Sequence, residues 1–100
     1  MPDLLTERSG RVVAARKLTR RSGRDDAGAF LAEGRQAVTE ALAEAVEDPD
    51  AVREVFATEA AAQAHRDLLA GTGVPVRLVT DKAAAVLSET VTPQLSLIHI

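Results

Sequence analysis

The sequence predicts a single α/β domain with a small, mainly parallel sheet covered by helices on both faces. Short apolar runs of strand length alternate along the chain with segments of helical periodicity. Strands that are joined through helices form right-handed crossovers, which make the strands parallel. A length of 100 residues also allows only one hydrophobic core. With 46% hydrophobic residues and only 2% aromatic ones, that core must be built from Ala, Val and Leu.

The first predicted element is a helix from Ser9 to Arg21. At about 100° per residue, apolar side chains fall on one side of it and cations cluster on the other. The apolar side comprises Val12, Ala15, Leu18 and Thr19. The cations are Arg16, Lys17, Arg20 and Arg21. The helix can therefore pack on the domain and still present positive charge. A loop is expected at 22–26, where Gly23 is followed by paired aspartates.

A buried strand is expected at Ala27–Gly34, because the run is short, apolar and closed by a charge and a glycine. The clearest helix follows over Arg35–Val46, where apolar residues recur with helical spacing. Pro49 ends it, since proline lacks an N–H and disfavours helical geometry at Asp48.

The second half of the chain repeats this alternation. A strand is predicted at Val52–Thr58, and Thr58 can cap a helix that ends at Gly71. A third strand covers Gly73–Thr80, with Pro75 near its start, where a missing donor is tolerated. Thr80 then caps a last helix over residues 81–89.

The charges are divided along the chain. The segment from Arg8 to Arg24 contains seven basic residues and no acid, which leaves a formal charge of −10 on the rest of a chain whose net charge is −3. Cations spaced over two helical turns can follow a nucleic-acid backbone, and Arg can grip phosphates with two hydrogen bonds. A solvated helix face would have the same composition, so both interpretations stay open at this point.

Several classes of function find no support in the sequence. There is no cysteine, which excludes disulfides, thiolate metal sites and a cysteine nucleophile and suits a cytoplasmic protein. No stretch approaches the roughly 20 apolar residues of a membrane span, and the N-terminus lacks a signal-peptide core. We therefore expect a protein that is neither secreted nor membrane-bound.

Individual polar residues suggest no active site. Asp25 and Asp26 are interpreted as turn residues, because no further metal ligand has a suitable spacing. His65 is expected to be a half-buried or surface histidine without a catalytic partner. There is no dinucleotide fingerprint and no P-loop. Glu33-Gly34 closes a strand before a helix, where α/β folds place ligands, although a glycine there also serves an ordinary tight turn. No catalytic and no metal-binding residue is predicted.

Four stretches in this order carry a family resemblance. They are the basic helix with Lys17-Leu18, the Arg24 segment leading to Phe30-Leu31-x-Glu33-Gly34, the strand Glu54-Val55-Phe56, and Thr92-Pro93-Gln94. Together they resemble the N-terminal substrate-binding domain of the SpoU/TrmH family of RNA 2′-O-ribose methyltransferases. The resemblance runs over residues 9–94, after an N-terminal tail at 1–8.

The resemblance implies an α/β/α sandwich like that of ribosomal protein L30e, which helps to hold a structured RNA such as 23S ribosomal RNA. In that family a following knotted domain binds S-adenosylmethionine, forms the dimer and methylates a ribose 2′-OH. That domain has no counterpart here, so we expect this chain alone to need no cofactor and to be inactive. By matching position, the resemblance makes five cations the candidates for RNA contact. It implies a structural role near the RNA for Glu33 and Gly34. The five are Arg16, Lys17, Arg20, Arg21 and Arg24.

The last six residues depart from the family pattern. Relatives usually continue Pro-Gln-Gly, whereas Leu95 follows Gln94 here, and Leu95–Ile100 contains no charge and both isoleucines of the chain. One codon reading of these residues matches a transposon-end adaptor used in sequencing libraries. We therefore expect 95–100 to be a non-native tail and the sheet to lack its native last strand. The alternative is a native edge strand, since Leu, Ile and Ser are acceptable there.

Two rival functions remain from the sequence. The first is a stand-alone L30e-like RNA-binding or ribosome-associated module with no enzyme attached. The second is a general interaction domain whose basic helix meets an acidic protein.

Overall fold

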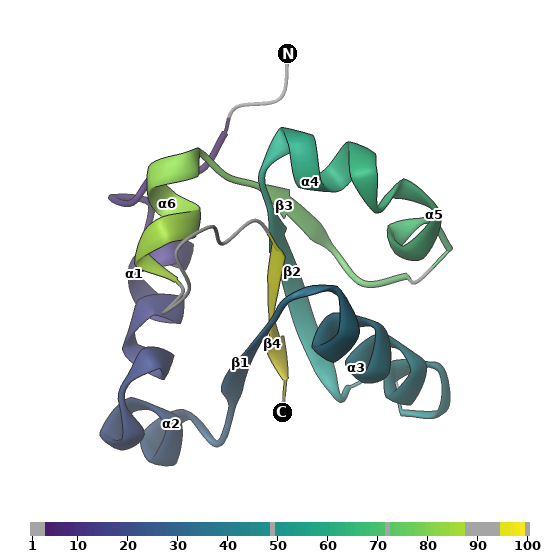
Figure 1. The fold of residues 1–100 in the computed structure, drawn as a ribbon. Coiled ribbons are helices and arrows are strands. Elements are labelled where there is room, and N and C mark those ends of the chain that lie inside the picture. Colours follow the sequence, from purple (N-terminus) through teal and green to yellow (C-terminus); the bar gives the residue numbers. More distant parts are fainter. Residues whose placement is uncertain (1–3, 49, 72, 88–94, 100) are drawn as a thin grey trace.

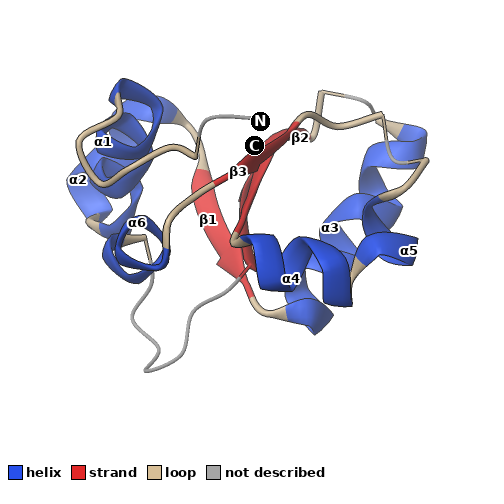
Figure 2. Ribbon diagram, turned by 90° about the horizontal axis from the view of Figure 1, so that it is seen from above, coloured by secondary structure: helices blue, strands red, loops and turns tan. Residues whose placement is uncertain are grey.

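The computed structural model describes residues 4–48, 50–71, 73–87 and 95–99, and shows an α/β/α sandwich (Figure 1). The four strands are β1 (Phe30–Glu33), β2 (Val52–Ala57), β3 (Val76–Leu78) and β4 (Leu95–His99). The helical elements are α1 (Gly10–Arg16), the 3₁₀ turn η1 (Lys17–Thr19), α2 (Arg21–Ala27), α3 (Arg35–Glu47), α4 (Glu59–Ala64), α5 (Arg66–Leu69) and α6 (Asp81–Val86). Figure 2 shows α1, α2 and α6 on one side of the sheet and α3, α4 and α5 on the other.

The sheet has the order β1-β4-β2-β3. β2 and β3 pair in parallel, and β4 runs antiparallel to both of its neighbours, β1 and β2. Three of the four strands therefore point the same way, which confirms the α/β class with a mainly parallel sheet. The outer edge of β3 is extended by Leu5, whose N–H donates to the Leu78 carbonyl at 2.9 Å. The expected tail at 1–8 is thus joined to the sheet at this residue.

β4 is formed by the segment that we expected to be foreign to the fold. Its backbone lies between β1 and β2, with Leu97 opposite Ala32 on one side and Val55 on the other. The sheet therefore has a fourth strand where the native last strand was expected to be missing, which shows that residues 95–99 are compatible with the fold and does not test their origin. Extended geometry suits this segment, because Leu and Ile side chains fit a pleated surface. The preceding family motif Thr92-Pro93-Gln94 lies outside the described residues.

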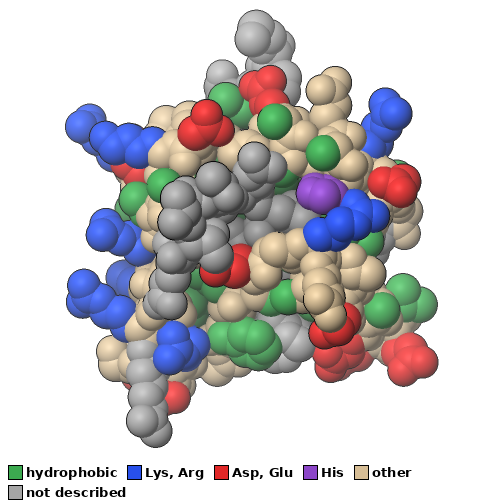
Figure 3. Space-filling view, viewed as in Figure 1, with side chains coloured by type: hydrophobic (Ala, Val, Ile, Leu, Met, Phe, Trp, Pro, Cys, Tyr) green, Lys and Arg blue, Asp and Glu red, His purple; other side chains and the backbone are tan. Residues whose placement is uncertain are grey.

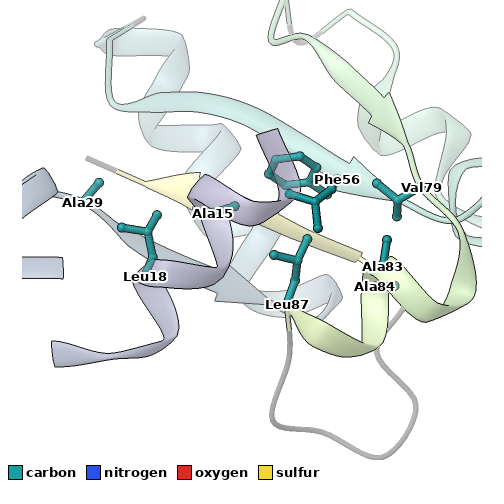
Figure 4. Close-up of a cluster of buried hydrophobic side chains, with 9 residues drawn as sticks. Ala15, Leu18, Ala29, Phe56, Val79, Ala83, Ala84 and Leu87 are labelled. Atoms are coloured by element: carbon teal, nitrogen blue, oxygen red, sulfur yellow. The ribbon is translucent and has the colours of Figure 1, made fainter. Parts of the chain in front are cut away.

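The apolar core consists of two clusters, because the sheet passes between them. One lies under α1 and α6 and includes Val12, Leu18, Phe56 and Leu87 (Figure 4). The other lies under α3 and α4 and comprises Val38, Ala41, Leu42, Ala45, Val52, Val55, Ala57 and Ala61. β2 serves both clusters, since neighbouring side chains of a strand point to opposite faces. Among the side chains that the structure describes, the buried hydrophobic ones other than Phe56 are Ala, Val and Leu, as predicted.

Both predicted threonine caps are confirmed. The Thr58 hydroxyl accepts from the Ala61 N–H, and the Thr80 hydroxyl accepts from the Ala83 N–H, each at 3.1 Å. The helix predicted after Thr58 is divided into α4 and α5, because the backbone at His65 leaves helical geometry (φ −113°, ψ 26°). None of the described helices is long and apolar enough to cross a membrane.

The prediction of one continuous basic helix followed by a loop is wrong. The helix is interrupted at Arg20, whose backbone is extended, and residues 22–26 belong to α2. Gly23 explains the difference, since a Cβ at this position would lie 1.9 Å from the Lys17 carbonyl oxygen. This glycine permits α2 to pack closely on η1 and does not mark a turn.

The first predicted strand is shorter and less buried than expected. β1 begins at Phe30, and its residues are half-buried or exposed. The physical reason is its place in the sheet, because β1 is an edge strand and pairs only with β4.

Candidate nucleic-acid interface

Three cations form an exposed row along the first helical segment. Arg16 ends α1, Lys17 begins η1, and Arg20 joins η1 to α2. All three side chains are exposed, and none forms an ion pair within the described part of the chain. Figure 3 shows Lys and Arg side chains along the side of the molecule where α1 and α2 lie. We call these three residues the basic ridge.

Arg11 belongs to the same basic stretch but has a structural partner. Its Nη1 lies 3.2 Å from Oε1 of Glu54, and Nε of Arg77 approaches the same oxygen at 3.2 Å. Glu54 lies on β2 under α1 and is only 7% exposed. The basic stretch has no acid in sequence, yet the fold supplies one from 43 residues further along. Arg11 therefore holds α1 on the sheet.

Arg24 has a position different from the other candidates. It is half-buried in α2, and its Nη1 donates to the Leu18 carbonyl at 3.3 Å, which holds α2 against η1. It also lines a hollow of about 330 Å³ beside the ridge. The hollow is lined by Leu18, Thr19, Arg24, Phe30, Leu31, Glu33 and Leu87.

Glu33 and Gly34 lie where β1 meets α3. Glu33 is half-buried and lines the same hollow as Arg24. Gly34 precedes α3 with φ +89°, a conformation that side chains rarely adopt, which explains the glycine. The structure thus brings Arg24 and Glu33 together, while the ridge stays on the adjoining surface. Arg21 begins α2, and its side chain lies outside what the structure describes.

Sequence reasoning missed two residues of this region. Phe30 was noted for its family pattern only, yet it is 43% exposed at the hollow. The other phenylalanine, Phe56, is only 1% exposed, and no local sequence feature distinguishes the buried phenylalanine from the exposed one. The sequence placed Glu54 in a strand, but the burial of its side chain beneath a basic helix depends on tertiary packing.

The other titratable side chains that the structure describes include one histidine and two neighbouring aspartates. His65 is half-buried, as predicted, and its Nδ1 meets Nη1 of Arg35 at the start of α3. Asp25 and Asp26 are exposed residues of α2. Within the described ranges, no group of three His, Asp or Glu side chains is placed to hold a metal ion.

The family assignment rests on nearly the whole chain, because residues 10–97 match the MRM3-like substrate-binding domain. The chain belongs to this family. The match confirms the resemblance seen in the sequence to the substrate-binding domains of SpoU-type RNA methyltransferases. No curated protein shows a significant match to the chain.

Solved structures show the same fold. A crystal structure of an RNA 2′-O ribose methyltransferase superposes with a TM-score of 0.73 at 19% identity, over 96% of this chain and 36% of its own length. The SpoU methyltransferase AviRb from Streptomyces viridochromogenes, in complex with the cofactor AdoMet, gives 0.69 at 22% identity, over 92% and 35%. An rRNA methyltransferase from Sinorhizobium meliloti gives 0.64 at 19% identity, over 97% and 36%. This chain therefore spans about a third of the length of each.

Proposed function

We propose that this domain recognises structured RNA, as the substrate-binding part of an S-adenosylmethionine-dependent RNA 2′-O-ribose methyltransferase. The observation that carries the proposal is the basic ridge, in which Arg16, Lys17 and Arg20 are exposed in a domain of the MRM3-like substrate-binding family. We further propose ribosomal RNA as the substrate, in keeping with the Sinorhizobium meliloti relative.

The distribution of charge supports an anionic partner at this side of the molecule. Between Gln36 and Asp50 the chain has no base and five acids, and all five are exposed. They are Glu40, Glu44, Glu47, Asp48 and Asp50. Figure 3 shows acidic side chains gathered where α3 lies, away from the cations of α1 and α2. A phosphate backbone is therefore attracted to one side and repelled by the other, which orients the RNA.

The mechanism available to this domain is electrostatic docking. The cations of the ridge replace counterions on the RNA, and their release makes affinity fall steeply with salt. The sheet keeps the ridge in place, because Val12, Ala15 and Leu18 anchor the same segment in the core. In this proposal the chain supplies RNA binding, and the chemistry is assigned to the rest of the intact enzyme.

The cofactor belongs to another part of the intact protein in this proposal. AdoMet would supply the methyl group, and this proposal assigns its site to a part of the enzyme outside this chain, because the chain spans only about a third of the AdoMet-bound relatives. The chain alone is accordingly expected to bind RNA without methylating it, and the intact enzyme is expected to be a homodimer through its catalytic domain.

Paired charge variants test the proposal. We expect Arg16→Gln with Lys17→Gln to weaken binding of a ribosomal RNA hairpin and to reduce the slope of log affinity against log salt by about 2, because each lost phosphate contact removes about one unit. Fluorescence anisotropy over a range of KCl concentrations measures both. A transfer RNA of similar length, measured in parallel, tests the ribosomal preference.

The matched control is Arg35→Gln with Arg66→Gln, which removes the same two charges from α3 and α5 on the opposite face. It should leave the salt slope unchanged. Equal losses in both double variants would mean that only net charge matters, and an unchanged affinity in the ridge variant would reject the proposal.

A further inference from the structure

Strand β2 contains a bulge at Arg53. Val52 and Glu54 pair with successive residues of β4, which leaves Arg53 as an extra residue of β2. Val55 packs in the cluster under α3, so strict alternation along the strand would direct Arg53 to that same side. Val52 occupies the α3 side instead, and the extra residue absorbs the difference. A bulge re-aims the side chain that it carries, and here it does so for an arginine.

The bulge brings Arg53 to the α1 side of the sheet, which Figure 2 shows facing away from α3. Its side chain is exposed and lines a groove of about 380 Å³ between α1 and β2, together with Arg11, Ala14 and Glu54. We call this the α1–β2 groove. Its volume falls within the range of roughly 300 to 1,000 Å³ that small-ligand pockets occupy. The small side chain of Ala14 leaves room for a ligand beside the helix.

The charges around the α1–β2 groove favour an anion. Glu54 is the acid that lines it, and this carboxylate is already paired with both Arg11 and Arg77, each at 3.2 Å. Two cations therefore compensate one buried acid. Arg53 forms no ion pair with any residue that the structure describes, so its positive charge is left for a ligand. A guanidinium can bind a phosphate through two parallel hydrogen bonds.

We propose that Arg53 contacts a backbone phosphate of the RNA, seated in the α1–β2 groove. The proposal rests on the proposed function and adds to it a contact that lies outside the basic stretch of the sequence. It assigns a purpose to the bulge, because an Arg53 on the α3 side would lie among the exposed acids of that helix and away from the RNA.

The α1–β2 groove and the basic ridge lie on different flanks of α1. At about 100° per residue, Ala14 in the groove and Arg16 in the ridge point in nearly opposite directions. An RNA that reaches both Arg53 and the ridge must therefore straddle the α1–η1 segment. Contacts on two flanks fix the rotation of the RNA about this segment, which contacts along one row cannot do.

Single-charge variants of the chain test the inference with the ribosomal RNA hairpin. We expect Arg53→Gln to reduce the slope of log affinity against log salt by about 1, so that the loss of affinity between 50 and 200 mM KCl becomes about threefold smaller. Arg53→Lys should keep the wild-type slope, because it keeps the charge. The matched control is Arg66→Gln, which removes one charge from an exposed side chain of α5 on the opposite face and should leave the slope unchanged.

A second variant tests the groove without changing any charge. Ala14→Leu should fill the space beside α1 and reduce the salt slope by about the same amount as Arg53→Gln, because the phosphate can no longer approach Arg53. Leucine is a good helix former and Ala14 is exposed, so the helix should be retained, which circular dichroism checks. An unchanged slope in the folded variant would reject the groove as the seat of the phosphate.

The outcomes separate this inference from the proposed function. Steeply salt-dependent binding that is weakened by Arg16→Gln with Lys17→Gln, but not by Arg53→Gln, would overturn the Arg53 contact and leave the proposed function standing. Absence of RNA binding by the wild-type chain would overturn both. Equal reductions of the slope in Arg53→Gln and Arg66→Gln would mean that only net charge matters, and would also reject the contact.

Discussion

The two faces of the sheet are covered by similar apolar cores, but the outer surfaces of the covering helices carry different charges. Each side has helices over a cluster made mainly of Ala, Val and Leu, with Phe56 added under α1 and α6, and β2 contributes side chains to both clusters. Outside, the α1–η1–α2 segment presents the basic ridge, whereas α3 presents Glu40, Glu44 and Glu47. The two faces thus have similar interiors, and in the proposed function the charges on their outer surfaces decide which face meets RNA.

The two sides also differ in how their helices are fastened. α3 is held by an apolar cluster of Val38, Ala41, Leu42 and Ala45. α1 has a similar cluster beneath it and, in addition, the ion pair between Arg11 and the buried Glu54. The buried carboxylate attracts the basic helix to the sheet. This attraction helps to fix the position of the ridge cations.

The largest effects should come from truncating the two cores. Phe56→Ala, under α1 and α6, should lower the free energy of unfolding by about 3 to 5 kcal/mol, and Leu42→Ala, under α3, by about 2 to 5 kcal/mol, because each leaves a cavity. Urea denaturation followed by circular dichroism measures both. If Phe56→Ala does not fold, Phe56→Leu removes less volume and should cost less than Phe56→Ala. A negligible cost for Leu42→Ala would contradict the equivalence of the two sides.

A smaller effect is expected where α2 packs on η1. Gly23→Ala should destabilise the domain by about 1 to 3 kcal/mol, because its Cβ would collide with the Lys17 backbone. Gly10→Ala is the control at the first residue of α1, where a Cβ meets nothing within 4 Å, and it should stabilise by about 0.4 to 1 kcal/mol. Thermal denaturation of the two variants should show opposite shifts. Shifts of the same sign would mean that α2 does not pack as described.

The smallest effect should separate structural from RNA-binding cations. Glu54→Gln and Arg11→Gln should each lower stability by about 1 kcal/mol, because the Arg11 side chain is 54% exposed and its ion pair is partly screened. Neither variant should change the salt slope of RNA binding, in contrast to Arg16→Gln with Lys17→Gln. A reduced slope for Arg11→Gln alone would place Arg11 among the phosphate contacts.

Local chemistry accounts for the parts of the fold that the sequence predicted correctly. Thr58 and Thr80 cap their helices through hydroxyls that reach an N–H three residues along, so neighbouring residues suffice to identify them. Helical spacing of apolar residues likewise located α3, and β-branched content located β2. These features depend on contacts within one turn or one strand.

The errors arose where distant contacts override local preference. Gly23 and the aspartates after it resemble a loop, but α2 forms there because the glycine fits against Lys17. β1 was expected to be buried, and its exposure reflects a place at the edge of the sheet that no local pattern reveals. In the candidate site, Arg16, Lys17 and Arg20 were recognised by charge alone, whereas the hollow required knowing that α2 and β1 lie together.

The sequence by itself determined the alternation of helices and strands, the caps and the segregation of cations from acids, because each depends on residues close together in the chain. Only the tertiary structure decided that Arg11 pairs with Glu54, that Phe56 is buried while Phe30 is exposed, and that Arg24 and Glu33 share a hollow. These pairings follow from packing helices on a sheet, which brings together residues that have no local reason to meet. The cations of one stretch are thereby divided between Arg11, which holds the fold, and Arg16, Lys17 and Arg20, which are exposed to solvent.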